Sequence, residues 1–171
     1  MPSVPGVPAM QSRRSLALRT IFTAGLVAGT LDLALAIIFF AVQGAPLLTI
    51  PHAIAAGLLG VRAFHGGISI AILGVALHYF IALTVADVYY AASLRIKSLN
   101  RHALFSGAAY GIAVFLVMSF IVVPLSAAPR SRPSPAWLIA DIGSHIFFIG
   151  ITIALITRRF AASHASPENT V

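Results

Sequence analysis

The sequence predicts an all-α integral membrane protein, a four-helix bundle that crosses the membrane four times and has both termini in the cytoplasm. Hydrophobic residues make up 59% of its 171 residues and charged residues only 9%, whereas soluble domains have about 45–50% and about 25%. A water-soluble domain of this length could not cover its surface with so few polar groups. The composition therefore excludes a soluble globular protein, a disordered chain and a coiled coil.

Four apolar stretches are each long enough to cross a bilayer, whose hydrocarbon core requires about 20 apolar residues in a helix. The stretches are continuously apolar and do not alternate with polar residues, which favours helices over the strands of a transmembrane barrel. We expect a transmembrane domain over residues 19–159, with spans at residues 20–42, 67–93, 103–125 and 137–157.

Proline and aromatic residues mark the ends of these spans. Pro124 ends the third span, because proline lacks a backbone donor and clashes with the preceding helical turn. Trp137 begins the fourth span, where the aromatic belt of the membrane interface is expected. Residues 1–18, rich in proline, serine and small side chains, are expected to be a disordered cytoplasmic segment, and residues 160–171 a short cytoplasmic tail.

The basic residues indicate the orientation. Eight of the eleven lie on one side of the predicted spans and three on the other, and the positive-inside rule places the eight in the cytoplasm. The eight are Arg13, Arg14, Arg19, Arg95, Lys97, Arg101, Arg158 and Arg159. The net charge of +7 is therefore an orientation signal. A nucleic-acid partner is not expected, because it would require a basic face on a soluble domain.

The first outer loop predicts one further helix. Thr49 could cap a helix that has Pro51 in its first turn. Residues 52–64 are mostly apolar but too few to cross the bilayer. We therefore expect a short interfacial or re-entrant helix on the outer face after the first span.

Small residues within the spans are candidates for helix packing, because they allow helices in lipid to approach closely. Gly25 and Gly29 form a GxxxG pair in the first span, and Gly107 and Gly111 form another in the third. Gly74 provides a similar position in the second span.

Matching positions in the two halves suggest an internal repeat. Both GxxxG pairs begin six residues after an arginine, Arg19 or Arg101. His78-Tyr-Phe-Ile in the second span also aligns with His145-Ile-Phe-Phe in the fourth. This pattern is typical of two parallel hairpins related by an axis along the membrane normal.

Ionisable residues within the spans are the main candidates for a functional site. At a helical rise of about 1.5 Å per residue, Asp32, His78 and His145 are expected at nearly the same depth in the membrane. Asp141 is expected about 9 Å closer to the outer surface. Asp141 and His145 are four residues apart and share a helix face. An unpaired charge at this depth costs about 2.5–3.5 kcal/mol on insertion scales. We therefore expect a buried Asp–His cluster, in which Asp32 pairs with His78 or His145.

Three functions follow from such a cluster. It could hold the helices together in a structural or assembly protein, which we favour at this point. It could serve a small proton- or ion-coupled transporter. His78 and His145 could also ligate a b-type haem, the one cofactor considered.

Enzymatic activity is not favoured, because the sequence lacks cysteine, HExxH, P-loop and dinucleotide motifs. No spacing supports a metal site. The expected partners are the lipid bilayer and either a second copy, docked around the GxxxG faces, or another membrane protein.

Several segments resemble a group of small bacterial inner-membrane proteins of unknown function. The segments are residues 24–32, 78–82, 89–93 and 123–127, and His145 with residues 153–156. The resemblance covers residues 19–159. It implies a multi-pass protein of the bacterial cytoplasmic (inner) membrane and brings no biochemical activity with it.

Overall fold

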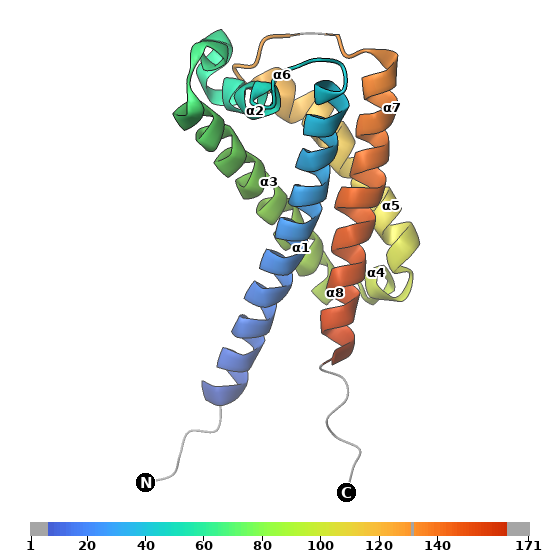
Figure 1. Ribbon diagram of the computed structural model, residues 1–171. Coiled ribbons are helices and arrows are strands. Elements are labelled where there is room, and N and C mark those ends of the chain that lie inside the picture. The colour runs from blue at the N-terminus through green and yellow to red at the C-terminus, as the bar shows by residue number, and fades with distance from the viewer. Residues whose placement is uncertain (1–6, 131, 164–171) are drawn as a thin grey trace, which may run out of the picture.

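The computed structural model describes residues 7–130 and 132–163, and every regular element in this part of the chain is helical. Four of the described segments are long and apolar enough to cross a membrane: Arg14–Ala41, Ile68–Arg95, Ala103–Leu125 and Pro135–Ala162. The predicted all-α class with four membrane-length helices is therefore confirmed. Figure 1 shows the start of α1 (Val7–Ala41) and the end of α8 (Thr152–Ser163) at the same end of the bundle, as an even number of crossings requires.

The helix α1 begins at Val7, well before the expected start of the first span. Residues 7–18, which were expected to be disordered, are therefore helical. The physical reason is local, because residues 9–24 contain neither glycine nor proline and Pro8 stands in the first turn, where its missing N–H costs nothing. At the other end, residues 160–163 of the expected tail continue α8. Residues 1–6 and 164–171 of the two expected terminal segments lie outside the described residues.

The predicted outer helix is α2 (Thr49–Leu59), which is followed by a 3₁₀ turn, η1 (Gly60–His65). It lies across the outer end of the bundle, and η1 and the start of α3 (Ile68–Arg95) lie at the same end (Figure 1). The choice between an interfacial and a re-entrant helix stays a prediction. Thr49 is the first helical residue and its side chain makes no capping hydrogen bond, so the expected cap is wrong.

The third and fourth spans each contain a π-helical segment. The third consists of α5 (Ala103–Val117), η2 (Met118–Val122) and α6 (Val123–Leu125), and the short α4 (Lys97–Arg101) precedes it. The fourth consists of α7 (Pro135–Ser144), η3 (His145–Ile151) and α8. Ser134 caps α7, because its Oγ accepts a hydrogen bond of 3.1 Å from the Trp137 backbone N–H. Neither π segment was predicted, and such segments occur often at functional sites.

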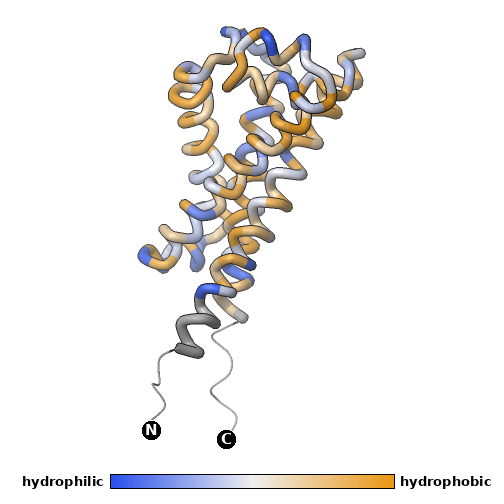
Figure 2. The backbone as a smooth tube through the Cα atoms, turned by 90° about the vertical axis from the view of Figure 1, so that its left-hand side faces the viewer, coloured by the Kyte–Doolittle hydropathy of each residue, from blue (hydrophilic) through white to orange (hydrophobic). Residues whose placement is uncertain are grey.

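The exterior of the bundle is apolar, as a lipid-facing surface requires. Large hydrophobic side chains are exposed along all four spans, for example Phe22, Phe80, Phe105 and Phe147. Figure 2 shows hydrophobic residues over most of the length of the bundle, whereas hydrophilic residues gather toward its two ends. The interior contacts, in contrast, are made largely by alanine and glycine.

Both GxxxG pairs are buried in contacts within the chain. A Cβ on Gly25 would lie 2.8 Å from Leu83 Cδ2, and one on Gly29 would lie 3.0 Å from Ala82 Cβ, both in α3. A Cβ on Gly107 would lie 2.8 Å from the carbonyl oxygen of Gly150 in η3. Gly150 was not predicted as a packing residue.

In each half, therefore, the glycine pair of the first helix packs against the second helix at its histidine or within the next few residues. This agrees with the proposed repeat. Both GxxxG faces are covered by contacts within the chain, and a homodimer stays a prediction.

The orientation can be tested with single cysteines, because the chain contains none. Ser98 on α4 and Gln43 after α1 are exposed and lie near opposite ends of the spans. We expect Ser98→Cys to react with a membrane-impermeant maleimide only in inside-out bacterial membrane vesicles, because the excess of basic residues retains that end in the cytoplasm. Gln43→Cys should react only in right-side-out vesicles. The reverse pattern would contradict the expected orientation.

Candidate functional site

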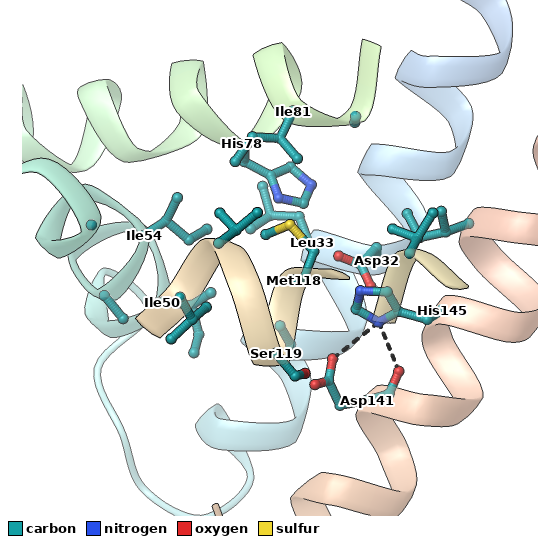
Figure 3. Close-up of a pocket in the computed structure, with 18 of the residues that line it drawn as sticks. Asp32, Leu33, Ile50, Ile54, His78, Ile81, Met118, Ser119, Asp141 and His145 are labelled. Carbon is teal, nitrogen blue, oxygen red and sulfur yellow. Dashed lines mark hydrogen bonds and ion pairs between the residues drawn. The ribbon is translucent and has the colours of Figure 1, made fainter. Parts of the chain in front are cut away.

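A cavity of about 430 Å³ lies toward the end of the bundle that carries α2, and residues of α2 line part of it. Its wall includes all four ionisable residues predicted from the sequence: Asp32 of α1, His78 of α3, Asp141 of α7 and His145 of η3. Figure 3 shows these side chains arranged around the cavity, with Asp32 and His145 close together. The fold thus places the four predicted residues around one shared space, although they come from three different spans.

Asp32 is not paired with a histidine. Its carboxylate accepts a short hydrogen bond from the Ser144 hydroxyl, which joins α1 to the end of α7. Among the described residues no direct hydrogen bond or ion pair links Asp32 to His78 or His145, so the expected pairing is wrong. Ser144 is the residue before His145 and is buried at the end of α7. Its hydroxyl, rather than the His145 imidazole, therefore contacts the Asp32 carboxylate.

His145 is held by Asp141, one helical turn earlier. Its Nδ1 lies 3.2 Å from the Asp141 carboxylate and 2.9 Å from the Asp141 backbone oxygen. The Phe115 ring packs edge-on against the imidazole, with the ring centroids 5.6 Å apart. This pair follows from the four-residue spacing alone. Because Nδ1 is engaged, Nε2 is the nitrogen of His145 that remains for a ligand in the cavity.

His78 contacts the backbone of α1. Its Nε2 lies 2.8 Å from the carbonyl oxygen of Gly29. A carbonyl only accepts hydrogen bonds, so the geometry assigns the proton to Nε2 and leaves Nδ1 as an acceptor in the neutral ring. The contact depends on Gly29, which lets α3 approach α1 closely.

The rest of the cavity wall is mainly apolar and aromatic. Ile50 and Ile54 of α2 cover it from the outer side, and Phe40 and Trp137 pack together beside it, with ring centroids 4.9 Å apart. Ser119 of η2 adds a hydroxyl. No lysine or arginine is among the described residues that line it. The two carboxylates therefore face the cavity without a permanently charged cationic side chain beside them.

Both π segments contribute to this wall, η2 through Met118 and Ser119, and η3 through His145 and Ile149. A π segment widens a helix locally and re-aims its side chains. Neither these two segments nor Ser144 was predicted from the sequence. A serine in an apolar helix commonly bonds to its own backbone, so nothing in the sequence distinguishes Ser144 as the partner of Asp32.

Asp87, the third acidic residue within the spans, is exposed and does not line the cavity. It lies nine residues beyond His78 on α3, toward the inner end. Asp87 therefore provides an internal comparison for Asp32, because it is a carboxylate on a spanning helix that is separate from the site.

Comparison with protein-family models, with curated proteins and with solved structures found no match for the chain. The resemblance to small bacterial inner-membrane proteins therefore stays a prediction.

Proposed function

We propose that this multi-pass membrane protein is a small transporter that exchanges protons for a cation in its central cavity. The observation that carries the proposal is that Asp32, His78, Asp141 and His145 all line one space of about 430 Å³. A ligand or water in that space can reach groups that change charge. The proposed location is the cytoplasmic membrane of a bacterium, supported by the helical spans and the bias of basic residues.

The chemistry of exchange follows from the two carboxylates. Asp32 has a serine hydroxyl as its partner and no described basic side chain in an ion pair with it. A proton or a bound cation would each neutralise the same charge, so the two compete for it. Intramembrane Asp and His residues that face a cavity commonly mark ion and proton pathways. His145, oriented by Asp141, provides a second proton-accepting group in the same wall.

A structural or assembly role is the second candidate, and two contacts favour it. The Asp32–Ser144 bond joins α1 to α7, and the His78–Gly29 contact joins α3 to α1. Interhelical hydrogen bonds of this kind contribute about 0.6 kcal/mol on average. A purely structural cluster has no need of a cavity around it, and this is why we favour transport.

The geometry gives no support to the haem alternative. His78 directs Nε2 at the Gly29 carbonyl, and His145 directs Nδ1 at Asp141. The two imidazoles are thus bound to different parts of the protein and are not presented as a facing pair of axial ligands.

The test of transport compares Asp32→Asn with Asp87→Asn. The purified protein is reconstituted in phosphatidylcholine vesicles with an acidic interior, and uptake of ethidium, a monovalent organic cation, is measured by fluorescence. We expect saturable uptake by the unmodified protein, at least tenfold lower uptake by Asp32→Asn, and unchanged uptake by Asp87→Asn. Equal uptake by Asp32→Asn, or no uptake above that of empty vesicles, would contradict the proposal.

A further inference from the structure

A second cavity, of about 370 Å³, lies between α3 on one side and α5 and η2 on the other. We call it the lateral slot. It adjoins the central cavity, because five residues line both spaces. These shared residues are Ile81, Val85, Val114, Met118 and Val122. The ionisable cavity is therefore separated from the slot only by apolar side chains that belong to both.

The lateral slot faces lipid. Phe80, Val88 and Val117 line it, and they are 68%, 53% and 46% exposed. Its polar groups are already bonded: the Thr84 hydroxyl donates to the Phe80 oxygen at 2.8 Å, and the Tyr110 hydroxyl donates to the Val85 oxygen at 2.7 Å. The slot thus presents an apolar surface suited to a hydrocarbon chain.

The slot exists because the close glycine contacts of α3 and α5 are made with other partners. Gly25 and Gly29 bring α1 to α3, and Gly107 and Gly111 bring η3 and α8 to α5. No comparable glycine contact among the described residues joins α3 to α5, so the space between them is not closed.

One end of the slot is bounded by Tyr110. Toward the inner end, Tyr110 hydrogen-bonds to α3 and packs its ring against Tyr89, with the centroids 5.0 Å apart. Along the rest of its length the slot is lined by exposed side chains of α3 and α5, among them Phe80, Val88 and Val117. Its opening is therefore lateral, toward the lipid-facing exterior of the bundle.

We propose that the slot is the entrance for the ligand, and that the ligand is an amphiphilic amine with a single hydrocarbon chain. This inference rests on the proposed function and specifies its substrate class. The chain would lie in the apolar slot. The protonated amine would reach the central cavity, where Asp32 and Asp141 supply two carboxylates and the described wall contains no lysine or arginine.

The test uses the only tryptophan, Trp137, which lines the central cavity. Dodecylamine is titrated at pH 7 into phosphatidylcholine vesicles that contain the protein, and Trp137 emission is recorded. Ala113 lines only the slot, whereas Ala109, one turn away on α5, is exposed and lines neither space. We expect saturable binding to the unmodified protein and to Ala109→Phe, and at least tenfold weaker binding to Ala113→Phe, whose ring would occupy the slot. Val117→Phe should behave as Ala113→Phe does.

The outcomes separate this inference from the proposed function. If Ala113→Phe and Val117→Phe bind dodecylamine as the unmodified protein does while Asp32→Asn binds it weakly, the lateral entrance is wrong and the cationic site stands. If dodecanol, which has the same chain and no charge, binds as tightly as dodecylamine, the amine assignment is wrong. If Asp32→Asn also binds dodecylamine normally, the cationic site itself is wrong.

Discussion

Replacing Gly111 by alanine should lower the free energy of unfolding by about 1–3 kcal/mol, the usual cost of overpacking a close contact. A Cβ at this position would collide with the carbonyl oxygen of His145 and lie 2.8 Å from Ile146 Cα. Both are backbone atoms, so a rotamer change cannot relieve the clash. The two helices would have to separate, which would also displace His145. Reversible unfolding of the purified protein in mixed micelles with increasing sodium dodecyl sulfate would measure the loss.

Gly143→Ala is the matched control for this prediction. Gly143 lies in α7 of the same spanning helix as His145, and a Cβ there would meet nothing within 4 Å. We expect this variant to be at least as stable as the unmodified protein, because alanine is the better helix former. Equal losses in the two variants would show that the cost does not come from the contact of α5 with η3.

Replacing Gly74 by valine should detach α2 from the outer end of the bundle. A Cβ on Gly74 would lie 2.7 Å from the carbonyl carbon of Pro51 and closer still to its oxygen. Because α3 is anchored on α1, the expected response is a movement of α2, which covers the central cavity. Ala56 on α2 is 0% exposed, so a cysteine there reports this movement.

We expect Ala56→Cys to react with a water-soluble maleimide at least tenfold faster in the presence of Gly74→Val. Gly67→Val is the control, because a Cβ on Gly67, next to the start of α3, would meet nothing within 4 Å. The rate of modification is measured by mass spectrometry of the purified protein in detergent. Slow modification in both backgrounds would mean that the Gly74 contact does not hold α2 in place.

The spans could be predicted from sequence because the bilayer leaves few alternatives. A chain in hydrocarbon has to satisfy its own backbone hydrogen bonds, and a helix of about 20 residues does so at the required length. Continuous apolar stretches therefore identified the spans, and prolines identified their ends. The start of α1 at Val7 escaped this reasoning, because a helix can continue into water wherever no residue interrupts it.

The residues of the candidate site could also be predicted, although their pairing could not. Helical rise placed Asp32, His78 and His145 near one depth, and small neighbours on their helix faces turned them inward. The Asp141–His145 pair follows from a spacing of four within one helix. The partner of Asp32 lies on another helix, and the choice between Ser144 and a histidine depends on how far those helices are rotated about their axes.

Sequence alone was sufficient for the membrane-length helices and the small-residue packing faces, because each follows from local periodicity and from the thickness of the bilayer. The tertiary structure was needed for the Ser144 contact, the two π segments, the central cavity and the lateral slot. These features depend on which glycine contact pulls which pair of helices together. Such a contact joins residues that lie far apart in the chain, and it depends on the distance between two helices to within about an ångström. No single segment of the sequence determines that distance.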